Sequence, residues 1–437
     1  MSARIRWVLG MAALVSASLA LFAGNVLAAT ELHVWPIGWT AAMQQYVRER
    51  VNPDFQAKYP GVEIVITPVG WNDATEKLTI AIAAGVPPDI VTTGGTTVIS
   101  YVPRGMLLPL DWFLEQWENY DRVYPGAWEN ARWEGKTYSV PFTVDLRLTA
   151  YHKDVFLEVG LDPERPPQSW EELETAVRLT TKIDGDTVVR RGVAFSTAMG
   201  DAGLAQRFGH LVIQAGGRLI SDDARTPLFN DEIGREALEF MKRLYDLGHP
   251  AGYRSPPSTG ISAFAAQQIA IELAASYVTP QNLFTQAPDL VSQLGAYPPR
   301  RSSDHPPVAL AFINGHGIPA ASKQPESAWA YIEHLLTPEN ARAFVELSGF
   351  MMPRRDLAEW IQEHRPALVP WFSAMDHVVA WPQVPGEIRG YTTLSEWIAR
   401  ALLGEVAPGI ALQQAEAAQI TLFNEYWAEI EGRAGER

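Results

Sequence analysis

The stretch EGKTYSVPFTVDLRLTAYHKDVF, which runs from Glu134 to Phe156, has an extended character over its whole length. Its β-branched and alternating apolar residues favour a strand, but the run is much longer than an ordinary strand. A segment that crosses from one domain to another would have this pattern. A second long apolar stretch, PVALAFINGHGIPA at residues 307–320, is the candidate for the return crossing. Together the two stretches predict two domains joined by crossing strands.

The residues before the first crossing alternate between strand and helix patterns. Helical spacing is found at residues 43–55 and 73–84, and the second helix has a predicted capping box at Asp73 and Glu76. The strand patterns lie at residues 31–36, 62–69 and 89–93. This order predicts an α/β unit with a mostly parallel sheet.

Ligands of such sheets bind beyond the carboxyl ends of the strands. The loops at residues 36–40, 67–72 and 92–97 follow the three predicted strands directly. We therefore expect these loops to line a ligand site.

The α/β alternation continues after the first crossing to about residue 307. A helix is predicted to begin at Ser169, with Glu172 as its capping-box partner. A helix after the return crossing has Thr337 as its N-cap and Gly349 just past its end. The further elements expected are strands at 192–197 and 269–275, helices at 204–214, 232–247 and 325–336, and a helical region from 353 to the C-terminus.

Residues 1–28 have the pattern of a secretory signal peptide. Arg4 and Arg6 precede an apolar run, and Val26 and Ala28 are suited to cleavage after Ala28. An uncleaved membrane anchor is the alternative, although the apolar run is near the lower length for a membrane span. Later segments are too short in apolar sequence to span a bilayer, so we expect no stable membrane insertion.

Composition narrows the class of protein further. The chain has 437 residues, a formal net charge of −15 and no cysteine. The length indicates two domains, and the acidity disfavours nucleic acid or an anionic membrane as a partner. A chain without cysteine has no disulfide, no thiolate metal site and no cysteine for a lipid anchor. A free, monomeric protein of the periplasm fits these features best.

Sequence motifs for catalysis are absent. The chain has no P-loop, no G-x-G-x-x-G, no H-E-x-x-H and no G-x-S-x-G. The nine histidines never recur at a spacing of three or four residues, so a helical metal site is not expected. The 50 acidic residues allow many carboxylate pairs, but nothing singles one out. We therefore expect a non-enzyme with no catalytic residue, no metal and no cofactor.

Four stretches, in this order, resemble the sugar-binding group of bacterial extracellular solute-binding proteins. This family includes maltose-binding protein and supplies the soluble receptors of ABC importers. The 138–173 stretch is the most specific, because it contains the family's Y-x-[VL]-P, Y-x-K-D and S-W-[DE]-E-L patterns together. The four stretches are GVPPDIVTTGGTTVISYVPRGMLLPLD (85–111), YSVPFTVDLRLTAYHKDVFLEVGLDPERPPQSWEEL (138–173), FAAQQIAIELAASYVT (264–279) and AWAYIEHLLTPENARAFVELSGFMMPRR (328–355).

The resemblance implies a periplasmic binding protein fold of type II, with two α/β lobes joined by hinge strands around a ligand cleft. Lobe 1 would comprise residues 29–144 and 308–350, and lobe 2 residues 145–307 and 351–437, after the signal peptide at 1–28. The receptor would capture a mono- or oligosaccharide by hinge closure and deliver it to the transmembrane subunits of an ABC importer.

A sugar presents hydroxyl edges and apolar faces, so polar side chains would meet its edges and aromatic rings its faces. Asp145 and Arg147 lie on the first crossing, where an acid contacts sugar hydroxyls by similarity; an internal salt bridge is the alternative. Tyr277 matches an aromatic residue that stacks on the ligand in the family, with core packing as the alternative. The other candidates are Trp39, Trp71, Thr93, Gly94, Thr96, Arg354 and Tyr391, with Gln206 and Arg207 as further candidates from lobe 2.

His316 lies between Gly315 and Gly317 on the return crossing, where the family often has G-G-W-G. The glycines would let the backbone and the ring approach the cleft, so Gly315 and His316 are candidate ligand contacts. Packing in the core or hinge is the alternative for His316, followed by catalysis or metal binding. Histidine in place of tryptophan would point to a smaller or more polar sugar.

Three other functions stay open at this level. The same fold could bind glycerol 3-phosphate or a glycerophosphodiester, with Arg147, Arg354 and Arg207 as anchors, although Asp145 disfavours a dianion. An exported carbohydrate-active enzyme and a chemosensory receptor are the others.

Overall fold

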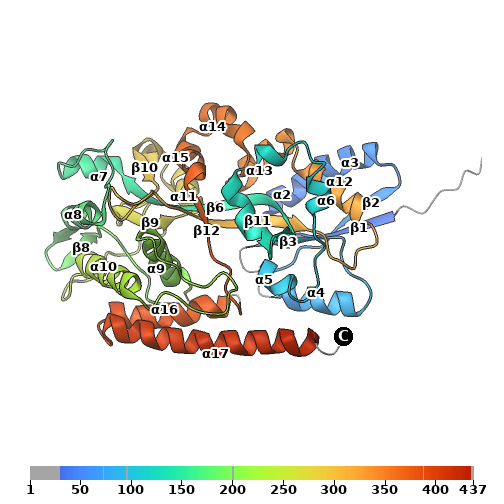
Figure 1. Ribbon diagram of the computed structural model, residues 1–437. Helices are drawn as coiled ribbons and strands as arrows, with labels where there is room; N and C mark the ends of the chain where they lie inside the picture. Colours follow the sequence, from blue (N-terminus) through green and yellow to red (C-terminus); the bar gives the residue numbers. More distant parts are fainter. Residues whose placement is uncertain (1–29, 72, 95–96, 199–200, 387, 435–437) are drawn as a thin grey trace, which may run out of the picture.

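The computed structural model describes residues 30–71, 73–94, 97–198, 201–386 and 388–434. Two α/β lobes lie side by side, with the strands β6 and β11 running between them (Figure 1). The predicted class and the two-lobe architecture are confirmed. The predicted signal peptide and Thr96 lie outside the described residues.

The first lobe is built on three parallel strands. Strand β1 (Thr30–Trp35) pairs with β2 (Val62–Ile66) on one side and with β3 (Ile90–Thr93) on the other. The helical segment between β1 and β2 comprises α2 (Ala41–Tyr46), a π-helical turn (Val47–Val51) and α3 (Asn52–Lys58). Its apolar residues at three- and four-residue spacing are buried against the sheet, as the sequence predicts.

Helix α4 (Ala74–Ala83) follows β2, but its predicted capping box does not form. The Asp73 side chain makes no cap hydrogen bond and instead pairs with Lys77, at an O–N distance of 2.5 Å. The i,i+4 ion pair competes for the carboxylate that would otherwise accept from the first turn.

Strand β6 (Val140–His152) is the first crossing and has 13 residues. It is shorter than the predicted 134–156 stretch because Glu134 and Gly135 form a turn with positive φ between β4 (Arg132–Trp133) and β5 (Lys136–Thr137). Strand β11 (Ala309–Gly317) is the return crossing, antiparallel to both β6 and β3. The crossing strands therefore extend the lobe 1 sheet towards lobe 2.

The second lobe packs helices around the far half of β6. Helix α8 (Trp170–Thr180) begins as predicted, with the Ser169 hydroxyl accepting from the Glu172 amide at 3.2 Å. The predicted strand at 192–197 is wrong, because a Cβ at Gly192 would lie only 2.1 Å from the Val177 carbonyl oxygen. This stretch packs tightly against the end of α8, and beyond an isolated bridge at Arg191 it forms no strand. The other elements of this lobe are α7 (Lys153–Glu158), β7 (Lys182–Asp184), β8 (Thr187–Arg190), α9 (Gly203–Gln214), α10 (Glu232–Gly248), β9 (Ile271–Ala275), α11 (Val278–Gln286) and β10 (Leu294–Tyr297).

The C-terminal region is mainly helical and contacts both lobes. Residues 351–375, which the resemblance assigned to lobe 2, pack with the core that contains the lobe 1 helices. Helix α17 (Pro408–Ala434) runs beneath both lobes in Figure 1, and its Tyr426 hydroxyl donates to the Ile99 carbonyl at 2.8 Å. The remaining elements are α5 (Thr97–Tyr101), α6 (Asp111–Leu114), α12 (Pro325–Leu335), α13 (Pro338–Ser348), α14 (Ala358–His364), α15 (Val369–Ser373), β12 (Val378–Ala380) and α16 (Ile388–Leu402).

Candidate ligand-binding cleft

The crossing strands present three polar side chains and one aromatic ring at partly exposed positions of one face. On β6 only Asp145 and Arg147 are half-exposed, and on β11 only Phe312 and Asn314. Residues two apart on a strand share a face, and Asp145 lies opposite Phe312 in the register of the pair. These four side chains therefore form a continuous surface between the lobes, which we call the cleft floor.

Asp145 and Arg147 form an ion pair on the cleft floor, with an Arg147 Nη2 to Asp145 Oδ2 distance of 2.7 Å. The Tyr277 backbone amide also donates to Asp145, and the Arg147 guanidinium lies 5.1 Å from the centre of the Phe312 ring. Burial raises the pKa of Asp145, although Arg147 acts in the opposite direction. The sequence alternatives of ion pair and ligand contact are thus compatible with one another.

Two polar atoms of the Asp145–Arg147 ion pair lack hydrogen-bond partners. Asp145 Oδ1 and Arg147 Nε are buried and have no hydrogen-bond partner among the described residues. A buried polar atom without a partner is costly. A ligand hydroxyl satisfies both atoms when it donates to Asp145 Oδ1 and accepts from Arg147 Nε.

Aromatic rings line the wall on the lobe 2 side. Tyr277 ends the turn after β9 and its half-buried ring packs on Phe350, with ring centroids 4.1 Å apart. Gly349 adopts φ 73° at the end of α13, which allows the chain to turn and place Phe350 there. Tyr277 is also adjacent to the cleft floor, since its backbone amide and its ring both act on Asp145.

Trp71 lines the opposite wall. A Cβ at Gly94 would lie 2.7 Å from Trp71 ring atoms and 3.0 Å from Asn314 Oδ1, and a Cβ at Gly38 would lie 3.8 Å from Trp71 Nε1. Only a glycine at position 94 leaves room for the half-buried indole of Trp71 against the loop after β3. The structure therefore brings together Trp71, Gly94 and the floor residue Asn314.

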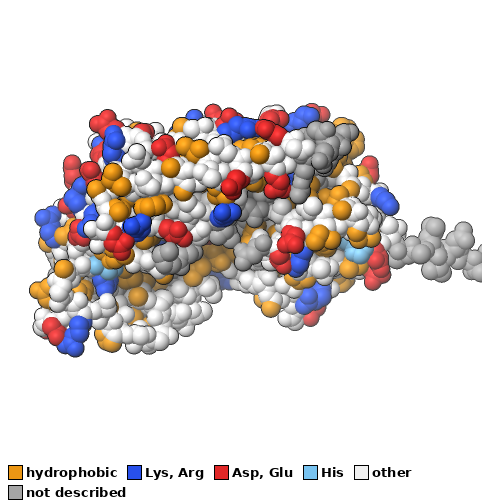
Figure 2. All heavy atoms as spheres, turned by 90° about the horizontal axis from the view of Figure 1, so that it is seen from below, with side chains coloured by type: hydrophobic (Ala, Val, Ile, Leu, Met, Phe, Trp, Pro, Cys, Tyr) orange, Lys and Arg blue, Asp and Glu red, His pale blue; other side chains and the backbone are white. Residues whose placement is uncertain are grey.

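The loops after β1, β2 and β3 meet at the carboxyl ends of these strands. The Ile37 amide donates to the Thr92 hydroxyl at 3.1 Å, and the Val69 amide donates to the Pro36 carbonyl at 3.0 Å. Thr93 is buried and pairs with Gly315 in the sheet, so its contribution to a ligand site would come through the backbone. Seen from below, the surface of the molecule is hollowed between its two ends (Figure 2).

His316 and Trp39 are not part of this cleft. His316 is fully buried, its ring centroid lies 4.5 Å from that of Phe142 and 5.9 Å from that of Trp39, and Phe344 completes the group. The packing alternative therefore describes His316, and Trp39 is a core residue beside it. Gly315 serves close packing of strands, since a Cβ there would lie 2.6 Å from the Val140 carbonyl oxygen.

Arg354 and Tyr391 also lie elsewhere, contrary to the expectation. The Arg354 guanidinium is buried, forms two hydrogen bonds with Asp356 and also donates to Asn119 and to the Leu336 carbonyl, so it serves the fold at this position and does not face the cleft. Tyr391 is buried in the lobe 2 core, where its hydroxyl donates to the Pro382 carbonyl at 2.9 Å.

Sequence reasoning missed Phe312, Asn314 and Phe350, and also Glu272, a buried carboxylate that acts on Arg147 and Arg207. Strand alternation could have found Phe312 and Asn314, because they share the face of β11 that lies beside Asp145. Phe350 and Glu272 carry no such signal, since a turn and an edge strand place them.

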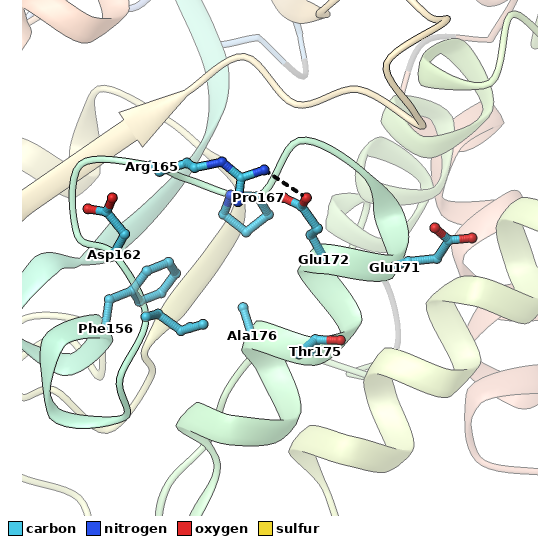
Figure 3. Close-up of a pocket in the computed structure, with 9 residues that line it drawn as sticks. Phe156, Asp162, Arg165, Pro167, Glu171, Glu172, Thr175 and Ala176 are labelled. Atoms are coloured by element: carbon cyan, nitrogen blue, oxygen red, sulfur yellow. Dashed lines mark hydrogen bonds and ion pairs between the residues drawn. The ribbon is translucent and has the colours of Figure 1, made fainter.

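A separate hollow of about 300 Å³ lies at the outer end of lobe 2, between α7 and α8. Phe156 and Ala176 line its base, and Arg165 pairs with Glu172 across its rim at 3.1 Å (Figure 3). Arg165 and Glu172 are engaged with one another, and none of the residues that line the hollow lies on the crossing strands.

Membrane-spanning helices and metal clusters are both absent from the part of the chain that the structure describes. In that part, no helix is both long and apolar enough to cross a membrane. No group of three or more histidine or acidic side chains is arranged to hold a metal ion there.

The fold combines two α/β lobes and two crossing strands with a cleft that has a polar floor and aromatic walls. This combination is typical of a two-lobed solute-binding protein. The family model of bacterial extracellular solute-binding proteins matches residues 37–342, and the chain belongs to this family. The resemblance found in the sequence is thereby confirmed.

Relatives and solved structures agree with this assignment. A Brucella abortus (strain 2308) protein named only as a binding protein is 24% identical over 390 residues, covering 84% of this chain and 88% of the relative. The mannitol-binding protein of Pseudomonas aeruginosa is 25% identical over 65% of this chain and 64% of its own length. The fold is similar to the sugar-binding protein MalE of Xanthomonas citri, with a TM-score of 0.79 at 21% identity and coverage of 92% and 99%. A Thermotoga lettingae solute-binding protein bound to α-D-tagatose has a TM-score of 0.70 at 24% identity and coverage of 90% and 100%.

Proposed function

We propose that this protein is a periplasmic receptor that captures a carbohydrate in the cleft and presents it to an ABC importer. The observation that carries the proposal is the pair Asp145–Arg147, with one open acceptor and one open donor, on a floor flanked by aromatic rings. A sugar hydroxyl can donate to the carboxylate and accept from the guanidinium, while the rings of Tyr277 and Trp71 cover its apolar faces.

The similar proteins support the same class of ligand. Their names give mannitol and α-D-tagatose, and a further similar structure is a binding protein for cyclic α-maltosyl-1,6-maltose. All of these are polyols or sugars, which share the hydroxyl-rich edges that the cleft floor is suited to bind.

The proposed working cycle has no chemical step. Lobe 1 and lobe 2 would close about β6 and β11 when the ligand contacts both walls, and the importer's transmembrane subunits would recognise the closed form. Export through a cleaved signal peptide at residues 1–28 and a monomeric state are part of the proposal.

One of the three arginines expected to bind a glycerol phosphate, Arg354, does not face the cleft. Arg354 is engaged by Asp356 and by carbonyl groups, which leaves Arg147 and Arg207 as cations near the cleft. Because Asp145 shares the floor with Arg147, a phosphate dianion would meet a carboxylate beside its cation.

The test is a thermal-shift and calorimetric screen of the purified protein against neutral mono-, di- and trisaccharides, sugar acids, polyols and glycerol 3-phosphate. Asp145→Asn should weaken sugar binding by at least about 30-fold, since Arg147 loses its charged partner and an NH2 donor replaces one of the two carboxylate acceptors. Tyr277→Ala should weaken it by about ten-fold or more through lost ring contact.

The matched controls are Asp222→Asn and Tyr253→Ala, which alter exposed residues of lobe 2. Both controls should bind like the wild type. Unchanged sugar binding in both cleft variants, or binding of glycerol 3-phosphate alone, would contradict the proposal.

A further inference from the structure

Arg207 lies beside the cleft floor on the lobe 2 side. Three residues further along α9, the His210 ring contacts the Val308 carbonyl at 3.1 Å, directly before β11 begins. The Trp381 ring lies between Gly209 of α9 and Phe312 of the floor. Arg207 shares a face of α9 with His210, three residues on, so this face is turned towards the start of β11, and Arg147 and Glu272 are among the charged groups that act on Arg207.

Arg207 is a cation whose charge is not balanced by a direct contact. Its Nη1 donates to the Gly203 carbonyl at 3.1 Å, and its Nε is buried without a hydrogen-bond partner among the described residues. It forms no ion pair within the described part of the chain, although Asp201 and Glu272 act on it from a greater distance. A desolvated guanidinium normally has a carboxylate or phosphate at contact distance.

The carboxylates near Arg207 are already engaged. Asp145 is held by Arg147 at 2.7 Å, Asp201 Oδ1 accepts from the Gly203 amide at 2.7 Å, and Glu272 Oε2 accepts from the Thr279 hydroxyl at 2.9 Å. Burial raises the pKa of Glu272, and the Thr279 hydroxyl and both arginines act in the opposite direction. Arg207 is therefore left without a carboxylate at contact distance among the described residues.

We propose that the ligand is an acidic sugar, and that Arg207 and Arg147 Nε form a subsite for its carboxylate. This inference rests on the proposed function, because it takes the cleft to be a carbohydrate site. It adds the class of sugar and a specificity-determining residue, Arg207, with Asp145 accepting from the neighbouring hydroxyl.

A carboxylate fits this subsite better than a phosphate does. Arg207 lacks a carboxylate at contact distance and Arg147 Nε lacks a hydrogen-bond partner, so one planar ligand carboxylate supplies the acceptors that both need. A phosphate dianion would bring a second charge close to Asp145 and Glu272, and this repulsion is strong where water is excluded.

The test compares matched pairs of neutral and acidic sugars by calorimetry: galactose with galacturonate, glucose with glucuronate, and galactobiose with digalacturonate, with glycerol 3-phosphate added. The wild type should bind one of the acids at least about ten-fold more tightly than its neutral partner. Arg207→Gln should weaken binding of that acid by about 30-fold or more and change binding of the neutral sugar by less than about three-fold. Arg207→Lys should restore part of the preference, because it keeps the charge but loses the fork geometry.

Arg218→Gln serves as the matched control, since Arg218 is an exposed arginine of the same lobe. Melting temperatures of all variants establish that they fold. A wild type that binds neutral sugars but not their acids overturns this inference and leaves the proposed function standing. A protein that binds no sugar of either kind overturns both. Equal acid binding by Arg207→Gln and the wild type removes Arg207 from the subsite.

Discussion

His316 is fully buried, and neither ring nitrogen has a hydrogen-bond partner among the described residues. Burial lowers its pKa to about 3, so the ring is neutral in the folded protein at neutral pH. A buried imidazole without partners is less favourable than an apolar group of similar size. The residue therefore lowers the stability of a core that is otherwise aromatic.

His316→Leu should raise the free energy of unfolding by about 1 kcal/mol at pH 7.5. The difference in the free energy of unfolding between His316→Leu and the wild type should grow as the pH falls. The folded pKa of about 3 lies below the ordinary 6.5, so the unfolded wild type binds a proton first, and stability is lost as the pH falls from 6.5 towards 3. At pH 5 this adds about 2 kcal/mol to the advantage of the variant.

Urea unfolding at pH 7.5 and pH 5 measures both effects, with the exposed His377→Leu as the control. A variant less stable than the wild type at both pH values would mean that the ring makes contacts that leucine cannot replace. Relative affinities for ligands should not change, because the ring lies away from the cleft.

Single residues also show what the sequence could and could not predict. Strand alternation places Phe312, Asn314 and His316 on one face of β11, and it places Asp145 on the adjoining face of β6. The sequence cannot say where along that face the lobe 1 core ends and the cleft begins. That limit is set by Trp39 and its aromatic neighbours, which cover His316 and stop short of Asn314.

At the scale of elements, the segment between α13 and α14 is fixed by one side chain. Arg354 joins Asp356, Asn119 and the Leu336 carbonyl at the end of α12. The same segment continues the sheet, because the Val144 amide donates to the Met351 carbonyl at 2.7 Å. A buried arginine here therefore fixes the position of Phe350 at the cleft without touching the ligand.

Arg354→Met should lower the free energy of unfolding by about 3–5 kcal/mol, because it leaves Asp356 largely buried without its main cationic partner. The neighbouring Arg355→Met is a matched control, since Arg355 is exposed and lies 4.0 Å from Asp376. Arg355→Met should lower the free energy of unfolding by less than about 1 kcal/mol. Denaturant unfolding decides the matter, and equal losses in both variants would show that the Arg354 cluster does not contribute to stability.

Helix ends that depend on short local motifs were predicted correctly. A segment whose conformation depends on tertiary packing was not. Gly349 ends α13 with φ 73°, and Ser169 caps α8, both as predicted from short motifs. The stretch 192–197 has strand composition, yet it lies against α8 because Gly192 permits a contact with Val177 that no other residue could make. Tertiary packing of this kind leaves no periodic signal in the sequence.

At the scale of the whole molecule, the two lobes are connected by more than the crossing strands. Besides β6 and β11, helix α17 joins them, since it packs with α10 and α16 in lobe 2 and Tyr426 bonds to Ile99 in lobe 1. Arg104 also contacts Tyr426 at 3.2 Å. Closure must therefore turn lobe 1 about a region that includes both the hinge strands and the end of α17.

The absence of cysteine makes this motion measurable, because spin labels can be placed at chosen sites without competing thiols. Thr67 follows β2 on the lobe 1 rim of the cleft, and Ala198 precedes α9 on the lobe 2 rim; both are exposed. With labels at Thr67→Cys and Ala198→Cys, the best-binding sugar of the screen should shorten the inter-label distance by several ångström, since contact with both walls favours the closed form. Double electron–electron resonance measures the distance, and a pair at Ala198→Cys and Tyr253→Cys, both in lobe 2, should show no change. A rim distance that stays constant at saturating sugar would mean that the cleft binds its ligand without closing, and recognition by an importer would then need a signal other than lobe closure.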